Sequence, residues 1–155
     1  MSDLLAGTKV NALDFPPAVY ASDTTQIDNP TNASYVAGTP EVGVTFIAPT
    51  SGRVWLIVGG GVGNSTGADR IFLSPEVRET NSSGAVVLAP SVITRGFSGH
   101  QGASTFHYAS RRTLLSGLIP GKQYYARVMY AVATSDSGAS TADIACRDIT
   151  VAPAT

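Results

Sequence analysis

The sequence predicts an all-β fold, a single antiparallel β-sandwich of about eight strands. From about residue 33 onward, short apolar or alternating runs are separated by Gly, Pro, Ser, Thr and Asn, which is typical of strands joined by turns. These runs recur at roughly the 8–12-residue spacing of sandwiches and barrels. No long segment has apolar residues at helical spacing, so residues 2–5 are the most that we expect to turn helically.

The first half of the body contains the shorter predicted strands. Val42, Val44 and Phe46 alternate with polar or small residues and predict one strand. Residues 53–58 (RVWLIV) form a continuous apolar run, which indicates a strand covered on both faces. The glycines after it are expected to permit a bulge, a tight bend or close contact with another backbone. Further strands are expected at 70–73, 77–78, 85–88 and 92–94, with breaks at Pro75 and Pro90.

Three longer strands are expected in the second half, at residues 105–115, 122–132 and 141–151. Residues 122–132 (KQYYARVMYAV) show the clearest alternation in the chain. In the last strand, strict alternation would place Ile144 and Cys146 on one face, and Arg147 and Ile149 on the other.

Residues 1–32 differ in composition from the sandwich domain expected at 33–155. They contain two prolines in succession and a stretch rich in Ser, Thr and Asp, so they are interpreted either as an extended N-terminal arm for docking or assembly, or as a floppy terminus. The candidate assembly contacts in this segment are its apolar and aromatic residues: Val10, Phe15, Pro16, Pro17 and Tyr20.

The chain carries few charges. Asp, Glu, Lys and Arg make up 14% of it, against roughly 25% in an average soluble domain, so we expect uncharged surface to be hidden in contacts within an assembly. A net charge of −1 without a basic run argues against a nucleic-acid partner. No apolar run reaches the ~18 residues of a membrane span, and no signal peptide is recognised, so synthesis in the cytoplasm is expected.

Cysteine and histidine give little support for a metal or cofactor. Cys146 is the only cysteine, which excludes an internal disulfide and a Cys-based zinc site. His100 and His107 lie seven residues apart, with no carboxylate at ligand spacing. We therefore expect no metal and no cofactor, although histidines from several copies could meet on a symmetry axis.

Two glycine-rich segments formally match catalytic or phosphate-binding motifs. Residues 63–67 fit G-x-S-x-G around Ser65, but the motif requires a following helix, and a strand is expected there. Residues 59–63 lack the Gly-Lys-Ser/Thr of a phosphate-binding loop. The sequence therefore predicts a protein that is not an enzyme, with a hydrolase centred on Ser65 as a remote alternative.

Three segments resemble known proteins. Residues 44–58 (VTFIAPTSGRVWLIV) resemble a hairpin of trimeric jelly rolls of the tumour-necrosis-factor and complement type, and 115–128 (LSGLIPGKQYYARV) are similar to a corner of extracellular β-sandwiches. Residues 6–14 (AGTKVNALD) resemble the N-terminal segments of virion fibre and decoration proteins in actinobacterial tailed bacteriophages and their prophages. The chain lacks the long stalk of a true fibre.

The resemblance implies a jelly-roll-like sandwich with a structural role in a bacteriophage virion. It implies self-association, as a trimer in that family, with the major capsid protein or another virion protein as partner. Decoration of the capsid is the leading hypothesis. The alternatives are a tail-fibre or baseplate component that binds host-surface glycan through exposed loop residues Phe97, His100 and His107, and a carbohydrate-binding module.

Overall fold

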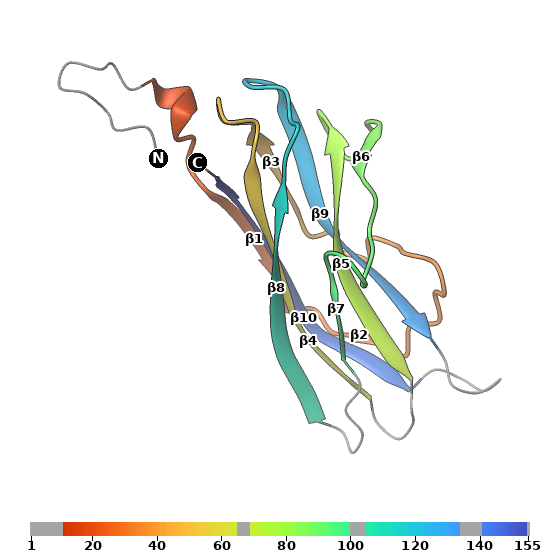
Figure 1. The fold of residues 1–155 in the computed structure, drawn as a ribbon. Helices are drawn as coiled ribbons and strands as arrows, with labels where there is room; N and C mark the ends of the chain where they lie inside the picture. Colours follow the sequence, from red (N-terminus) through yellow and green to blue (C-terminus); the bar gives the residue numbers. More distant parts are fainter. Residues whose placement is uncertain (1–10, 65–68, 100–104, 134–140, 155) are drawn as a thin grey trace.

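The computed structural model describes residues 11–64, 69–99, 105–133 and 141–154, and within them the chain is an antiparallel β-sandwich (Figure 1). Apart from one 3-10 turn, all regular elements are strands, as the sequence predicts. The elements are η1 (Ala12–Asp14), β1 (Val19–Asp23), β2 (Ile27–Asp28), β3 (Gly43–Ile47), β4 (Val54–Asn64), β5 (Arg70–Glu79), β6 (Val86–Leu88), β7 (Phe97–Gly99), β8 (Thr105–Leu115), β9 (Gln123–Ala133) and β10 (Ala142–Pro153).

The strands form two layers. Sheet A has the order β1-β10-β4-β8, with β2 also paired to β10; sheet B has the order β3-β9-β5-β6, with β7 also paired to β5. β1 and β2 act as one interrupted strand, and so do β6 and β7, which leaves eight strands in chain order. The outermost of these in sequence pair with each other (β1/β2 with β10), then the next ones inward (β3 with β9, β4 with β8), and finally the middle two (β5 with β6/β7). This nested pairing is the topology of a jelly roll.

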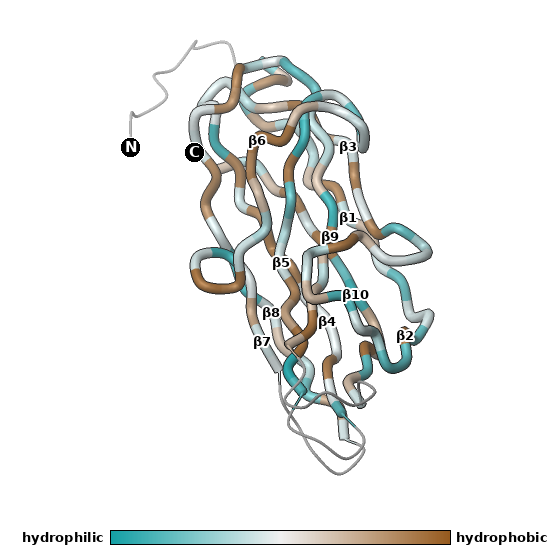
Figure 2. The backbone as a smooth tube through the Cα atoms, turned by 90° about the vertical axis from the view of Figure 1, so that its right-hand side faces the viewer, coloured by the Kyte–Doolittle hydropathy of each residue, from teal (hydrophilic) through white to brown (hydrophobic). Residues whose placement is uncertain are grey.

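The core lies between the sheets. Inward-facing positions carry branched aliphatic side chains, among them Leu56 and Val58 on β4 and Ile71 and Leu73 on β5, all fully buried. In Figure 2, hydrophobic and hydrophilic segments accordingly alternate along the strands. This alternation is why the periodicity of the sequence locates most of the strands.

Strand β4 extends further than expected. It continues through Gly59, Gly60 and Gly61 to Asn64, with unbroken pairing to β8, so the strand does not end at Val58 as expected. The expected close contact with another backbone is present, because a Cβ on Gly60 would lie 2.6 Å from the main-chain oxygen of Cys146. The reason for the glycines is steric: side chains of neighbouring strands and of the facing sheet, and the main-chain oxygen of Cys146, occupy the space where side chains on these glycines would lie. Glycine here makes room within a central strand rather than bending it.

Two predicted features of sheet B also differ. β5 runs unbroken through Pro75, because β7 pairs with Ile71–Leu73 and β6 with Val77 and Arg78, and neither pairs with Pro75. Pro75 is paired with Val128 of β9 on one side only, and a proline without an N–H is tolerated where the other side of the strand has no partner. The strand expected at residues 92–94 is instead a turn, in which the amides of Arg95 and Gly96 donate to the carbonyl of Ser91.

A β-bulge changes the faces of β10. The register with β4 shifts between Ile144 and Cys146, so Ala145 is an extra residue. Ile144 therefore shares the buried face with Arg147 and Ile149, whereas strict alternation would place Ile144 with Cys146.

Much of the expected N-terminal arm belongs to the sandwich. β1 pairs with β10 over five residues and β2 pairs with it over two, so residues 19–28 form an edge of sheet A rather than an extended arm. Their alternation is short and polar, which explains why composition alone did not reveal them. Before β1, Thr50 ties η1 to the body: its amide donates to Leu13 and its hydroxyl to Asp14.

A buried ion pair joins this edge to the interior. The side chain of Arg147 is fully buried, and its Nη2 donates to Asp23 Oδ2 at 2.8 Å. Its Nη1 donates to the carbonyl of Ala37 at 3.3 Å, so Arg147 connects β10, β1 and the segment before β3. Gly38, with φ of +78°, has no room for a Cβ beside this guanidinium.

Candidate assembly surface

The outer face of sheet A is largely apolar. Residues that face outward on its central strands include Trp55 and Ile57 on β4 and Tyr108 and Leu114 on β8, and the β10 residues paired with this stretch of β4 are mostly small or uncharged. Tyr108 is 67% exposed and Leu114 is 44% exposed. Tyr20 on β1, 63% exposed, extends the same face across β10. A contiguous apolar sheet face of this kind is typical of a protein–protein contact.

One cation lies on this face. The guanidinium carbon of Arg112 is 4.5 Å from the ring centroid of Trp55, within the range of a cation–π contact. The N–H groups of a guanidinium lie in its own plane. A guanidinium stacked on an indole ring can therefore still donate hydrogen bonds sideways to another group.

A shallow depression lies beside this cation. It has a volume of about 360 Å³, and its lining includes Gly59, Gly60, Tyr108, Ser110 and Asp148. A Cβ on Gly61 would lie 2.5 Å from Tyr108 Cε1, and one on Gly59 would lie 2.6 Å from Asp148 Oδ2. The glycines thus allow an aromatic ring and a carboxylate from the two flanking strands to lie close to the sheet.

The carboxylate in the depression has no donor among the described residues. Every other described acidic side chain accepts a hydrogen bond or pairs with a cation. Asp148 has no such bond, and partial burial raises the pKa of its carboxyl group. A partly desolvated carboxylate without a donor is unfavourable in the isolated chain, and a partner that supplies N–H or O–H groups would relieve that cost.

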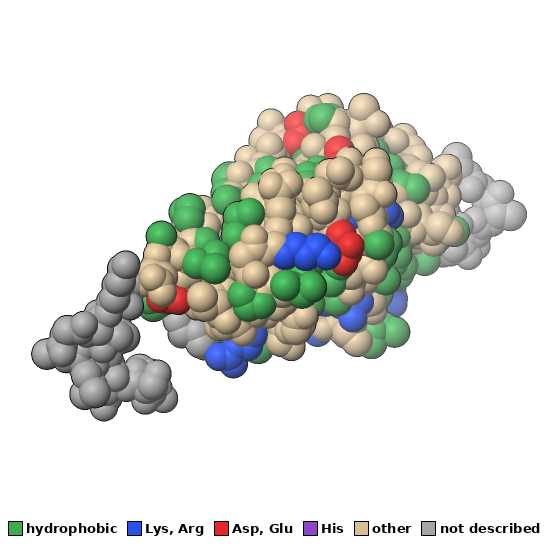
Figure 3. Space-filling view, turned by 90° about the horizontal axis from the view of Figure 1, so that it is seen from above, with side chains coloured by type: hydrophobic (Ala, Val, Ile, Leu, Met, Phe, Trp, Pro, Cys, Tyr) green, Lys and Arg blue, Asp and Glu red, His purple; other side chains and the backbone are tan. Residues whose placement is uncertain are grey.

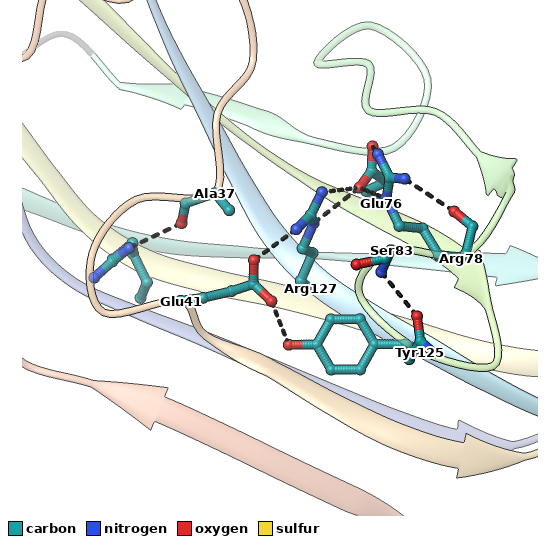
Figure 4. A network of polar contacts seen from close by, with 10 residues as sticks. Ala37, Glu41, Glu76, Arg78, Ser83, Tyr125 and Arg127 are labelled. Atoms are coloured by element: carbon teal, nitrogen blue, oxygen red, sulfur yellow. Dashed lines mark hydrogen bonds and ion pairs between the residues drawn. The ribbon is translucent and has the colours of Figure 1, made fainter.

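The outer face of sheet B has a different character. Arg127 bridges Glu41 (Nη1 to Oε2, 2.6 Å) and Glu76 (Nη2 to Oε1, 2.7 Å), and Arg78 pairs with the same Glu76 at 2.7 Å (Figure 4). Tyr125 donates to Glu41; its burial, reinforced by this bond, raises the pKa of Tyr125 to about 12. The charges on this face satisfy one another, so it has less need of a partner than sheet A.

The end of the sandwich near the termini is also poor in charge. Figure 3 looks onto this end. Hydrophobic and uncharged side chains cover most of it, and only a few Lys, Arg, Asp and Glu groups are visible. Phe15, 54% exposed, and Ile119, 58% exposed, lie in the segments at this end.

The structure separates the predicted N-terminal contacts. Phe15 and Pro17 are exposed and Pro16 is half-buried in the segment between η1 and β1. Tyr20 projects instead from the outer face of sheet A. Val10 lies outside the described residues.

The predicted loop contacts are not brought together as one exposed cluster. Phe97 lies in β7, where it is partly buried and packs against the core, so it does not belong to an exposed loop. His107 is exposed on β8. His100 lies outside the described residues.

Sequence reasoning missed Trp55, Tyr108, Arg112 and Asp148 as candidate site residues. Alternation in residues 105–115 could have placed Tyr108 and Arg112 on one face of a strand. It could not have placed Asp148 beside them, because β8 and β10 become neighbours of β4 only through the tertiary pairing.

A second hollow, of about 460 Å³, lies among Ile27, Asn32, Val36 and Tyr130, and the residues that line it carry no charged side chain. The part of the chain that the structure describes holds no cluster of three or more potential metal-ligating side chains and no helix long and apolar enough to cross a membrane. Ser65, at the centre of the formal G-x-S-x-G match, lies outside the described residues.

No protein-family model matches the chain, and no curated protein matches it significantly. Two solved structures are similar in fold, one described as infectious bursal disease virus Gx strain and one as the infectious bursal disease virus VP2 subviral particle, both with TM-scores of 0.56. Identity is 10% and 9%; the alignments cover 88% and 90% of this chain but 31% and 33% of those chains, so this chain spans about a third of their length.

Tobacco streak virus coat protein aligns less closely, with a TM-score of 0.34, 15% identity, and coverage of 89% of this chain and 86% of the coat protein. At 9–10% identity, the two similar structures establish a shared fold and nothing further. The chain is therefore an all-β jelly roll whose fold also occurs in virus proteins.

Proposed function

We propose that this chain is a structural, non-enzymatic virion protein of a bacteriophage, located on the capsid as a decoration protein. The observation that carries the proposal is the outer face of sheet A, which presents Trp55, Ile57, Tyr108 and Leu114 over a jelly roll. A fold shared with virus proteins and the low overall charge support it.

In this proposal, copies associate with one another through the outer face of sheet A, and the charge-poor end near Phe15 docks on the shell. The resemblance to trimeric jelly rolls favours three copies. The charges of the sheet B network are paired within one copy and largely buried, with the side chain of Arg127 12% exposed and that of Glu76 6% exposed, so this network needs no partner in the assembly.

Two measurements on the purified chain test the proposal. Light scattering at micromolar concentration should give the mass of an oligomer, and the chain should co-sediment with capsid shells assembled without it. Many copies spread over the shell would support decoration, whereas a few copies at the tail would favour a fibre or baseplate component. A monomer that does not bind shells would contradict the proposal.

A further inference from the structure

Two opposite charges on the outer face of sheet A, those of Arg112 and Asp148, both lack an ion-pair partner among the described residues. Asp148 is the acidic side chain there that lacks a donor, and Arg112 forms no ion pair and donates no hydrogen bond among the described residues. The remaining outward side chains between them are uncharged. A face with one free charge of each sign is complementary to a second copy of itself.

The two charges do not pair within one copy, where a whole strand lies between them. Arg112 is on β8 and pairs with Ile57, whereas Asp148 is on β10 and pairs with Gly59; β4 separates the two. Strands in a sheet are about 4.8 Å apart, so the two backbones are separated by roughly 10 Å across the sheet. Arg112 is moreover held over Trp55.

We propose that Arg112 of one copy enters the depression of a second copy and pairs with Asp148 there. This inference rests on the proposed self-association and names its central contact.

The geometry of each partner suits the contact. Trp55 holds the guanidinium flat, so little side-chain freedom is lost when the contact forms. In the depression, the guanidinium would meet the Asp148 carboxylate, the Ser110 hydroxyl and the ring of Tyr108, which together offer hydrogen-bond acceptors and a cation–π surface. The volume of about 360 Å³ accommodates a guanidinium group.

The other exposed arginines do not fit this role. Arg70 begins β5 in sheet B, so it does not project from the outer face of sheet A. Arg53 lies before β4 at the end of the sandwich, farther along the strand from Gly59 and the depression than Ile57, the partner of Arg112. Arg111, adjacent to Arg112, points to the other side of β8 and donates to carbonyls of residues 92–96. Arg112 is therefore the cation that a second copy would present.

A charge exchange tests the contact by sedimentation velocity over a range of protein concentrations. Arg112→Asp and Asp148→Arg, each alone, should weaken self-association at least about tenfold, which is 1.4 kcal/mol. The double variant should recover most of the affinity, because it exchanges the two signs. Arg70→Asp makes the same charge change away from the face and should associate like the original chain. A cooperative urea transition confirms that each variant is folded.

Each outcome has a defined meaning. If the original chain is a monomer, the proposed self-association fails, and this contact with it. If the original chain is an oligomer and either single variant associates as tightly, or the folded double variant does not recover, this contact alone is wrong. Weak binding of methyl glycosides that Asp148→Asn abolishes without changing the oligomer would assign the depression to a sugar and overturn the contact.

Discussion

Two glycines of β4, Gly61 and Gly63, lack a Cβ at positions where neighbouring atoms fill the space that a Cβ would need. Above Gly61 the nearest atoms belong to the exposed ring of Tyr108, whereas above Gly63 the nearest atom is the main-chain oxygen of Thr105, which leaves no room for a Cβ. A side chain can move aside and a paired backbone cannot, so two glycines of one strand should respond differently to the same substitution.

We expect Gly63→Ala to lower the free energy of unfolding by about 1–3 kcal/mol, because a paired strand must move. Gly61→Ala should cost less than about 1 kcal/mol, because Tyr108 can swing outward and alanine removes backbone entropy from the unfolded chain. Urea denaturation of both variants measures the difference. Equal losses would show that Tyr108 is fixed as rigidly as the backbone.

Asp23 should make the stability of the protein sensitive to acid. Burial acts to raise the pKa of Asp23, but hydrogen bonds from Thr25 and the pairing with Arg147 outweigh it and lower the pKa below its usual 3.8. The ionised carboxylate therefore stabilises the fold at neutral pH, and this contribution is lost as the pH falls through the lowered pKa.

We expect Asp23→Asn to be less stable than the original chain at pH 7, because Arg147 is left buried without a counter-charge. The difference in melting temperature should shrink as the pH falls below about 4. Adding Arg147→Met should recover stability at pH 7. Asp28→Asn, an exposed neighbour, is the control and should change little; a constant difference across pH would contradict the role of the ion pair.

At the scale of elements, one arginine connects the turn after β6 to sheet A. Arg111 Nη1 donates to the carbonyls of Val92 at 3.1 Å and Gly96 at 2.8 Å, and its Nη2 donates to Thr94 at 3.0 Å. The turn itself is closed by the bonds from the amides of Arg95 and Gly96 to Ser91. The N–H groups of one planar guanidinium therefore satisfy several carbonyls of the turn that would otherwise have to accept hydrogen bonds from water.

Arg111→Lys should destabilise the protein by about 1–2 kcal/mol, because an ammonium cannot reproduce this fork. The amides of Arg95 and Gly96 should then exchange hydrogen for deuterium faster. Arg112→Lys, which changes the adjacent residue on the outward side, is the matched control and should leave both exchange rates unchanged. Unaltered exchange in Arg111→Lys would mean that the turn is held by its own backbone bonds.

Elements were predicted best where one face is buried and the other exposed. β9 matches the expected 122–132 to within a residue at each end, because its inward and outward positions alternate regularly. Agreement failed where another element overrode the local signal: a neighbouring strand continues β4 past its glycines, and the gap between β6 and β7 allows Pro75 within β5. These pairings are not encoded in any short window of the sequence.

At the scale of the whole molecule, the N-terminal strands belong to the folded unit and set where it begins in the sequence. β1 covers one edge of β10 and supplies Asp23 to the buried Arg147, whereas the residues before Val19 contact the body mainly through η1 and Thr50. The boundary between the sandwich and any docking segment should therefore lie before β1.

Deletion of residues 1–17 should leave a folded chain with an unchanged dependence of unfolding free energy on urea, and should weaken binding to shells if that segment docks. Deletion of residues 1–28 should abolish cooperative unfolding or cause aggregation, because it exposes the edge of β10 and leaves Arg147 unpaired. A stable product from the longer deletion would show that the fold does not depend on β1.

By itself, the sequence determined the fold class and most strand positions, because alternation of apolar and polar residues is a local consequence of burying one face of a strand. It also indicated, through low charge, that part of the surface belongs in a contact. Only the tertiary structure shows the sheet face on which we propose that contact. Nested pairing places β8 and β10 on either side of β4, and so brings Tyr108 and Asp148, forty residues apart in the chain, to the two sides of one glycine-floored depression.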